Sequence, residues 1–374
     1  MAKAAKIISA LFFLVSLSVL LKVLFLNSYQ DLTQYYLGVK AVNPYLSGVI
    51  YPPTALVIFS FLNLFPLFII ERVWTALSII ALFTSVYLIF KMYNKQILSS
   101  LGFMVLGLVC WSFPVKFTLG MGQINNFILL LFVAAIYLLR QKKSSLAAFL
   151  LSLSFAIKLF PAYLILQFVA MKKWKFLLTF IISLFLLSLF AFIIIGPNNN
   201  LYFYQHLLPT FLSGWKTDYY NQALTGFVGR SLPYNFFSQS LVNLLSLFFI
   251  LVSCLVIFKA RKNKELVNMS FGLLITLNLI VNNFSWQHHF VFLLFPFLAT
   301  LFYVQTIKNN FRLLFLLFVS YVWVSFNLVN PYAVPVLLQS HVLYGAILLW
   351  ILEVYLIWKD SRPLLLSFPA KARR

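Results

Sequence analysis

The chain has 374 residues, of which 63% are hydrophobic and 9% are charged, and its formal net charge is +22 at pH 7. The core of a water-soluble protein does not need so much apolar surface. Apolar runs of about 18 or more residues recur, which is typical of transmembrane helices. A soluble chain this basic would suggest nucleic-acid binding. Here the lysines and arginines cluster between apolar runs, so we expect no nucleic-acid partner.

The first apolar run covers residues 7–27 and follows Lys3 and Lys6. It is longer than the apolar part of a typical signal peptide and lacks a small-residue cleavage site, so we interpret it as a retained anchor. The two lysines predict a cytoplasmic N-terminus by the positive-inside rule.

Residues 28–53 are then expected on the outer side of the membrane. Residues at helical spacing predict a short amphipathic helix on the membrane surface that ends at Asn43 and Pro44. These residues are Leu32, Tyr35, Tyr36, Val39 and Val42. The apolar residues 52–68 contain three prolines. We predict a second interfacial or re-entrant helix there, because a full crossing would place the basic residues 91–95 outside.

With this topology the second true span begins at Glu71 and ends near Lys91, and all later basic clusters are cytoplasmic. The clusters are residues 140–143, 172–175, 259–264, 308–312 and the tail from 359. Of the 28 lysines and arginines, only seven lie at or beyond the outer edge: Lys22, Lys40, Arg72, Lys116, Lys158, Lys216 and Arg230. Both termini are therefore expected in the cytoplasm of a multi-pass cell-membrane protein.

Residues 144–171 start and end inside but are too short for two spans of about 20 residues each. We predict two short helices that meet near Lys158 and Pro161. The predicted fold is an all-α polytopic bundle of about twelve membrane helices, forming one domain over residues 1–374. The longest polar stretch, 197–237, is expected outside. Cys110 and Cys254 lie in apolar spans and are expected to be free thiols.

Five polar segments are predicted at the outer face, each where an apolar span ends. Polar and ionisable residues at such positions are costly and usually functional. The segments are Asp31 with its neighbouring tyrosines, residues 119–126, Lys158, residues 219–230 and residues 282–289.

Five short motifs within or beside these segments occur in the order and spacing of glycosyltransferase family 87, which the chain resembles from about residue 30 to about residue 300. They are Tyr-Pro-Pro at 51–53, Gly-Gln-Ile-Asn at 122–125, Ala-Ile-Lys-Leu-Phe-Pro at 156–161, Asn-Gln-Ala-Leu at 221–224 and Ser-Trp-Gln-His-His at 285–289. The family holds membrane-embedded mannosyltransferases of the GT-C class. The resemblance implies a GT-C-like bundle, a polyprenyl-phosphate sugar donor, a site on the outer face and an aspartate in the first outer loop as the base.

The residues themselves fit such chemistry. Glycosyl transfer from a sugar phosphate needs a base for the acceptor hydroxyl and positive groups for the departing phosphate. Asp31 is the only carboxylate of the first outer loop. A single base suits one in-line displacement, so we predict inversion at the sugar carbon; retention would usually need a second carboxylate nearby. The expected reaction moves a hexose, with mannose preferred, to a lipid or glycan acceptor.

The remaining site residues follow from their charge and polarity. We expect Lys158, Arg230 and His288 to bind the donor phosphate, and we favour His289 as the histidine that faces the reaction centre. The residues expected to contact sugar or acceptor are Tyr35, Gln123, Asn125, Asn221, Gln222 and Trp286. Positions 30 and 33 are Gln and Thr rather than acids, so we expect no metal and no cofactor.

Several structural interpretations compete with these roles. Asp31 followed by Gln34 also matches a helix capping box. Gln123 and Asn125 could serve only to begin a helix, and Lys158 could extend to the lipid headgroups. The adjacent histidines could form an interfacial pair without a ligand; we do not expect them to bind zinc, because neighbouring positions of a helix diverge.

Two other functions compete with the transferase. A lipid or sugar transporter, or a flippase, would also have many spans and few charges, but such proteins tend to carry inverted repeats and charges near the middle of the membrane. Neither feature is visible in the sequence. A polysaccharide polymerase or ligase of similar architecture would share the lipid-linked donor and stays open as an alternative.

Overall fold

The computed structural model describes residues 2–25, 29–213 and 217–361, and this part of the chain is helical with short connections. Its α-helices are α1 (Ala2–Leu21), α2 (Gln30–Gly38), α3 (Pro53–Ser60), α4 (Leu67–Met92), α5 (Ser100–Trp111), α6 (Phe113–Gly120), α7 (Asn125–Arg140), α8 (Ser144–Ile157), α9 (Leu164–Ala170), α10 (Trp174–Ile195), α11 (Pro197–Tyr202), α12 (Leu208–Ser213), α13 (Leu224–Ser231), α14 (Phe236–Ala260), α15 (Lys264–Val281), α16 (Leu294–Val304), α17 (Phe311–Ser325) and α18 (His341–Asp360). The all-α fold expected from the sequence is confirmed.

Among the described residues, six helical segments are long and apolar enough to cross a membrane, and the pair α5 and α6, bent by 54°, would make a seventh. The six are Lys3–Leu21, Leu67–Met92, Trp174–Ile195, Phe236–Ala260, Gln287–Val304 and Val336–Asp360. Shorter apolar helices of 10–17 residues lie among them. The polytopic character is therefore confirmed, whereas the number of twelve membrane helices stays a prediction.

The helices of the bundle differ in how much of their surface is buried against other parts of the protein. In the most apolar window of α10 only 11% of the residues are buried, and in that of α1 only 17% are, so both helices present apolar side chains to the outside. The corresponding window of Gln287–Val304 is 83% buried. The segment that follows the histidine pair therefore lies at the centre of the bundle, where its position is held by packing on all sides.

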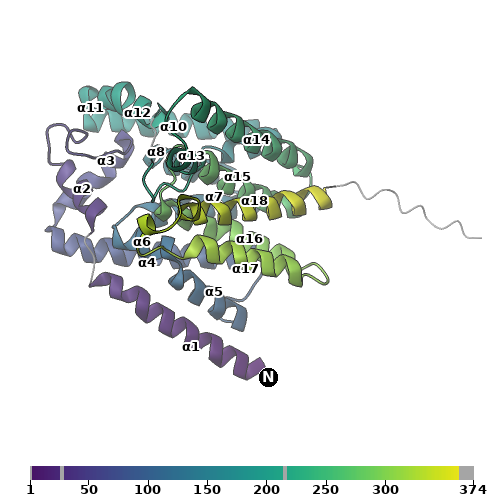
Figure 1. Ribbon diagram of the computed structural model, residues 1–374. Helices are drawn as coiled ribbons and strands as arrows, with labels where there is room; N and C mark the ends of the chain where they lie inside the picture. The colour runs from purple at the N-terminus through teal and green to yellow at the C-terminus, as the bar shows by residue number, and fades with distance from the viewer. Residues whose placement is uncertain (1, 26–28, 214–216, 362–374) are drawn as a thin grey trace, which may run out of the picture.

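Short helices gather at one end of the long ones. In Figure 1, α2, α3, α11 and α12 lie together at the left, where α4 begins. At the opposite end, the Arg140 side chain donates a hydrogen bond to the backbone carbonyl of Met92. Because Arg140 ends α7 and Met92 ends α4, the basic segments after these two helices lie side by side, as the predicted topology requires.

The first loop after α1 forms two short helices. α2 ends at Gly38, so the prediction that it reaches Asn43 was wrong. A Cβ at Gly38 would lie 2.2 Å from Val49, so the chain turns back closely against the end of α2. α3 begins with Pro53 at its first position, where proline needs no partner for a missing N–H. The predicted second short helix is thus confirmed.

The two predicted short helices and the break between them are also present. α8 ends at Ile157, and Lys158 has an extended backbone (φ −146°, ψ 121°). α9 begins at Leu164 after Pro161. Neither α8 nor α9 has the length of a full span, and the break between them leaves Lys158 at the end of a helix rather than within one.

The predicted sidedness can be checked by cysteine labelling. In a chain with Cys110 and Cys254 replaced by Ala, we expect Asn198→Cys to react with a membrane-impermeant maleimide from outside intact cells, because residue 198 is exposed and belongs to the stretch predicted outside. Gln141→Cys should react only after the cells are opened, because it lies in a basic cluster. The opposite pattern would place the polar end of the bundle in the cytoplasm.

Candidate active site

Asp31 lies in the first turn of α2 but does not cap it. The helix begins at Gln30, and the N-cap is Tyr29, in a left-handed backbone conformation and with no side-chain cap hydrogen bond. The capping-box interpretation of Asp31 is therefore wrong. The backbone N–H groups of Asp31 and Leu32 both donate to the carbonyl of Met121, at 3.0 and 3.2 Å. These bonds tie the start of α2 to the loop between α6 and α7.

The Asp31 carboxylate is bonded to that same loop through a side chain. Gln123 Nε2 donates to Asp31 Oδ2 at 2.5 Å. The Gln123 carbonyl oxygen accepts from the hydroxyl of Tyr35 at 3.0 Å and from that of Tyr51 at 2.7 Å. Two residues expected to contact the sugar, Gln123 and Tyr35, are thus joined to the predicted base.

Lys158 points into the bundle. Its Nζ donates to Asn125 Oδ1 at 2.7 Å and lies 2.9 Å from His289 Nε2. It also lies 5.4 Å from the centre of the Tyr51 ring, within the range of a cation–π contact. The interpretation that Lys158 extends to the lipid headgroups is therefore wrong, and Asn125 has a role beyond the start of α7.

The two histidines occupy different environments. His289 faces Lys158, and its Nδ1 accepts a hydrogen bond from the backbone of Trp286 at 3.2 Å. The His288 ring lies parallel to Trp286, with centroids 6.4 Å apart, and packs edge-on against Phe117 at 5.4 Å. The His288 carbonyl accepts from Thr118 Oγ1 at 2.9 Å. His289 is therefore the histidine beside the lysine, as the sequence analysis preferred, while His288 belongs to an aromatic wall.

The Asn221–Gln222 segment supports the histidine segment. Gln222 N–H donates to the Ser285 carbonyl at 2.8 Å, and Asn221 and Trp286 form an isolated antiparallel bridge. The Asn221 side-chain oxygen accepts from Ser285 N–H at 3.1 Å. Gln222 Nε2 donates to the Gln339 carbonyl at 2.8 Å. Both amide side chains are fully buried, so the hydrogen bonds that they make hold backbone in place.

Arg230 also supports backbone. Its Nη1 donates to the carbonyls of Asp218 and Asn221, both at 2.8 Å, and its Nη2 donates to Ser340 Oγ at 2.6 Å. Among the described residues, no hydrogen bond joins Arg230 to Lys158 or to the histidines. The structure thus brings Asp31, Gln123, Asn125, Lys158 and His289 together and leaves Arg230 in the last turn of α13.

The electrostatics of Asp31 and Lys158 are coupled, and both residues lie outside the helices that are long enough to span a membrane. Burial raises the pKa of the Asp31 carboxyl above its ordinary value, while the Gln123 hydrogen bond and the Lys158 charge oppose this rise. Burial lowers the pKa of the Lys158 ammonium to about 7, and the Asp31 carboxylate partly offsets that fall. The acid and the amine therefore titrate closer together than they would in water.

Sequence reasoning assigned no role to Tyr51 or Thr118. Tyr51 belongs to the Tyr-Pro-Pro motif at 51–53, which was the available signal. Thr118 lies in α6, and its hydrogen bond to the His288 carbonyl spans 170 positions of the chain. No local pattern predicts such a contact.

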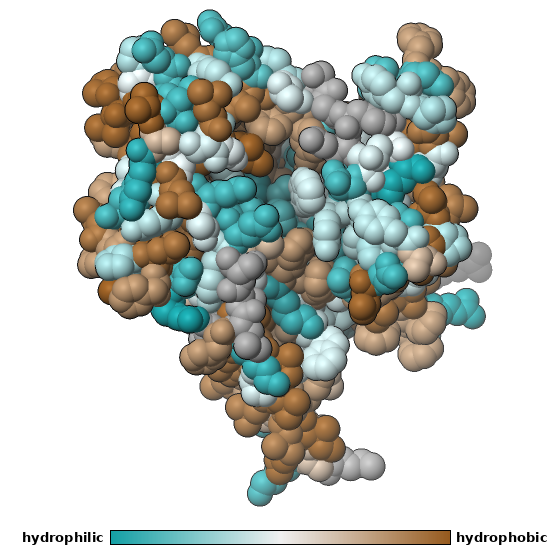
Figure 2. Space-filling model, turned by 60° about the vertical axis from the view of Figure 1, so that its left-hand side comes forward, coloured by the Kyte–Doolittle hydropathy of each residue, from teal (hydrophilic) through white to brown (hydrophobic). Residues whose placement is uncertain are grey.

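The surface above this site is polar between apolar flanks. Figure 2 brings the side with α2 and α3 forward and shows hydrophilic residues gathered toward the middle of that face. Asp31 and Lys158 are both partly exposed. Tyr220, 37% exposed, stacks on Trp286 with centroids 6.1 Å apart, so the aromatic wall of Phe117, Tyr220, Trp286 and His288 reaches the surface.

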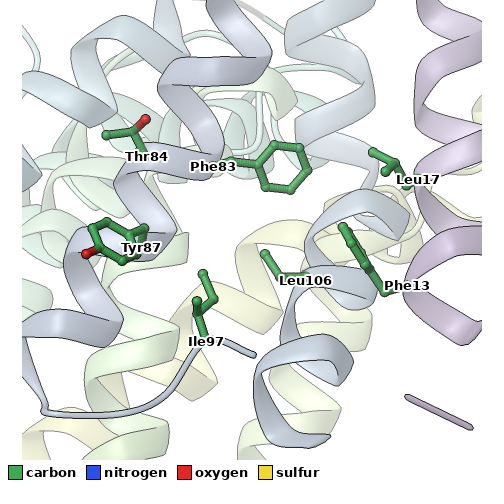
Figure 3. A pocket seen from close by; sticks show the side chains of 7 residues that line it. All are labelled: Phe13, Leu17, Phe83, Thr84, Tyr87, Ile97 and Leu106. Carbon is green, nitrogen blue, oxygen red and sulfur yellow. The ribbon is translucent and has the colours of Figure 1, made fainter. Parts of the chain in front are cut away.

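A separate apolar hollow of about 500 Å³ lies between α1, α4 and α5 (Figure 3). It is lined by Phe13, Leu17, Phe83, Thr84, Tyr87, Ile97 and Leu106. Trp74 marks the level of the site along α4, because its indole donates to the Gly122 carbonyl at 2.8 Å. The α4 residues that line the hollow lie nine or more positions after Trp74. At 1.5 Å per residue the hollow lies roughly 14 Å or more farther along α4, and we do not count it as part of the site.

The model of glycosyltransferase family 87 matches residues 50–282. This chain belongs to glycosyltransferase family 87. The resemblance found in the sequence is thereby confirmed. Gln123, Asn125 and Lys158 fall within the matched range. Asp31 lies before it and His289 after it.

Two curated relatives are similar to this family member. Each is named a polyprenol-phosphate-mannose-dependent alpha-(1-2)-phosphatidylinositol pentamannoside mannosyltransferase. The relative from Mycolicibacterium smegmatis is 26% identical over 250 residues, which cover 65% of this chain and 58% of the relative. The relative from Mycobacterium tuberculosis is 26% identical over 251 residues, covering 65% and 56%. The chain thus spans little more than half the length of these relatives. No solved structure matches it.

Gly122 offers a test of how tightly the site is built. Its φ is +68°, and a Cβ there would lie 2.5 Å from the Leu32 Cβ. We expect Gly122→Ala to move α2 away from the loop and to lower sugar transfer about 100-fold, because small misplacements of reacting groups cost that much. The measurement is transfer by the purified protein in detergent.

Gly48→Ala is the matched control. Gly48 also has a positive φ, +91°, but a Cβ there meets nothing within 4 Å. Both variants carry a backbone cost of about 1 kcal/mol, so only the contact with Leu32 differs. Equal losses of transfer in the two variants would mean that the approach of α2 to the loop does not matter.

Proposed function

We propose that this protein is a membrane mannosyltransferase that moves mannose from polyprenol-phosphate mannose to a hydroxyl of a lipid or glycan acceptor. Membership of glycosyltransferase family 87 and the names of the two relatives support the reaction class and the donor. The observation that carries the proposal for this chain is the meeting of a carboxylate and a lysine from segments far apart in sequence. Gln123 holds Asp31, and Asn125 and His289 hold Lys158. Tyr51 links the two groups, because its hydroxyl bonds Gln123 and its ring lies 5.4 Å from Lys158 Nζ.

In the proposed reaction Asp31 is the general base. Its Oδ2 is held by Gln123, and among the described residues no hydrogen bond reaches Oδ1. The acceptor oxygen attacks the anomeric carbon while its proton passes to Oδ1. The bond between that carbon and the phosphate oxygen breaks, and its electron pair leaves with polyprenol phosphate. A single displacement of this kind inverts the sugar carbon.

Lys158 is proposed to bind the departing phosphate. An ammonium group is a point charge that suits a phosphate oxygen, and a preorganised charge aimed at developing negative charge lowers the barrier. Asn125 and His289 hold Lys158 Nζ from two sides. His289 would therefore act at the phosphate through Lys158 or directly beside it. Arg230 lies in α13 and bonds backbone carbonyls and Ser340, and His288 belongs to the aromatic wall, so we assign neither to the phosphate.

The sugar is proposed to lie against the aromatic wall. Tyr220 and Trp286 are stacked and reach the surface, and aromatic faces pack well on the apolar face of a sugar ring. The outer, extracytoplasmic location of the site is supported by the distribution of lysine and arginine along the chain. The chemistry needs no metal at Asp31, whose neighbours Gln30 and Thr33 offer no second carboxylate; metal independence stays a prediction.

The transporter alternative gains no support. A transport pathway usually places its ionisable groups midway along the bundle. Here Asp31 and Lys158 lie at the end of the bundle where α2 and α3 gather (Figure 1).

Replacing the base gives a direct test. We expect Asp31→Asn to lower kcat of transfer from polyprenol-phosphate mannose by about 10² to 10⁴, the usual contribution of a general base, while donor binding is retained. Glu71→Gln, which removes another carboxylate near the start of α4, is the control and should keep wild-type turnover. Near wild-type turnover in Asp31→Asn would eliminate the proposed base.

The pH dependence of kcat/KM should be bell-shaped. Transfer needs Asp31 ionised, so activity should fall as the pH drops through a pKa that burial has raised above the ordinary aspartate value. Phosphate binding needs Lys158 protonated, so activity should also fall as the pH rises through about 7. The kcat/KM profile reports the free enzyme and is the quantity to measure.

Lys158→Arg distinguishes the fall of kcat/KM at low pH (the acid limb) from its fall at high pH (the alkaline limb). A guanidinium stays protonated throughout the accessible range, so any residual transfer by this variant should lose the alkaline limb and keep the acid limb. An alkaline limb unchanged in Lys158→Arg would exclude Lys158 as its origin.

A further inference from the structure

Gln123 has little capacity left to bind a sugar. It is 6% exposed, its carbonyl oxygen accepts two hydrogen bonds from tyrosine hydroxyls, and one of its N–H groups is bonded to Asp31. An amide oxygen has two acceptor positions, and both are filled. The side chain that the sequence analysis expected to contact the sugar is therefore committed to protein groups.

The two phenols determine which way the amide points. The Gln123 oxygen receives the Tyr35 and Tyr51 hydroxyls, whose oxygens also lie 2.9 Å from each other. This arrangement favours an amide whose nitrogen is turned toward Asp31. A reversed amide would place an oxygen 2.5 Å from the carboxylate, where two acceptors repel unless Asp31 carries a proton. The arrangement that satisfies Tyr35 and Tyr51 is thus the arrangement that suits an ionised Asp31.

Packing fixes the two phenols. The Tyr35 ring is stacked on Phe59, with centroids 4.2 Å apart and planes 3° apart, and it meets the Tyr51 ring edge-on at 5.2 Å. Tyr35 is 2% exposed and Tyr51 is 5% exposed. One face of Tyr35 is therefore occupied by Phe59, and neither ring is free to stack on a sugar that arrives from outside.

Other charged groups near Asp31 can also affect its pKa. Lys158 is the nearby cation at the end of α8, and it contacts His289. From α4, Arg72 donates to the Tyr29 hydroxyl at 3.4 Å, two positions before Asp31. Further titratable groups close to the cluster are His288, whose ring centroid lies 4.5 Å from that of His289, and the phenols of Tyr29, Tyr35 and Tyr51.

We propose that Gln123, Tyr35 and Tyr51 are positioning residues that hold one oxygen of Asp31, keep the carboxylate ionised and leave its other oxygen for the acceptor hydroxyl. This inference rests on the proposed function, because it concerns the same base. It reassigns Tyr35 and Gln123 from sugar contact to control of the base and gives Tyr51 a role in catalysis without contact to the substrate.

The test compares Tyr51→Phe, Tyr35→Phe and the double variant in transfer assays over a range of pH. Removing the phenol donors frees the amide to turn, so the acid limb of kcat/KM should move upward by about one pH unit in the double variant, equivalent to about a tenfold loss at a pH below the limb. The KM for the donor should stay at the wild-type value. A rise of KM with an unmoved acid limb would instead mean that the tyrosines bind sugar, and the inference would be overturned.

Tyr45→Phe is the matched control. Tyr45 lies in the same outer loop and is 5% exposed, but its hydroxyl has no hydrogen-bond partner in the described part of the chain. Its removal should leave both the acid limb and kcat unchanged. A limb that moved equally in Tyr45→Phe would show that any loss of a buried phenol has the same effect.

A second readout does not depend on transfer. Infrared titration of the protein in nanodiscs can follow the carbonyl band of the protonated Asp31 carboxyl, identified by its loss in Asp31→Asn. The band should appear at higher pH in Tyr51→Phe and at still higher pH in the double variant. An unmoved band overturns the positioning role. If the wild-type protein transfers no sugar while the band moves as expected, the proposed function fails and the positioning role of these residues stands.

Discussion

A carboxylate and an amine lie close together in an apolar helix bundle, and the surrounding side chains lower the free-energy cost of burying them. Burying either group alone is costly unless it is paired or hydrogen-bonded. Asp31 is held by the Gln123 amide, and Lys158 is held by Asn125 and His289. Burial raises the pKa of one group and lowers the pKa of the other. The higher pKa makes Asp31 a stronger base, and the lower pKa brings the titration of Lys158 to about pH 7.

Two groups of side chains follow from this constraint. Some act on Asp31 or Lys158, either by bonding them or, like Tyr35 and Tyr51, by bonding Gln123. Others hold the backbone: Asn221 and Gln222 fix the segment before the histidines, and Arg230 fixes the loop that carries Asn221. Mutations in either group would lower activity, but only those in the first group act on the titration of the base.

Much of this arrangement was predictable from the sequence. The scarcity of acids singled out Asp31, and the broken apolar run at 144–171 predicted a hairpin with Lys158 at its turn. Both signals are local, since they depend on composition and on the lengths of apolar runs. The family motifs then marked Gln123, Asn125 and the histidines as parts of one site.

The partners of these side chains could not be predicted in the same way. Gln123 was expected to contact sugar and Arg230 to bind phosphate, because polar and basic groups near a transferase site usually do. The choice between substrate and protein as a partner depends on contacts such as that between Tyr51 and Gln123, which lie 72 positions apart. The end of α2 was missed although the helix ends on Gly38, a residue common at helix C-termini. The close return of Val49 against Gly38 is a contact that the helical spacing does not reveal.

The order in which the site residues occur along the chain has a consequence for biosynthesis. Asp31 enters the membrane environment early, whereas His289 and its central segment follow some 258 positions later. A nascent chain still attached to the ribosome therefore exposes the acid long before its counterpart arrives. The environment that holds Asp31 and Lys158 is therefore complete only once nearly four-fifths of the chain has been made.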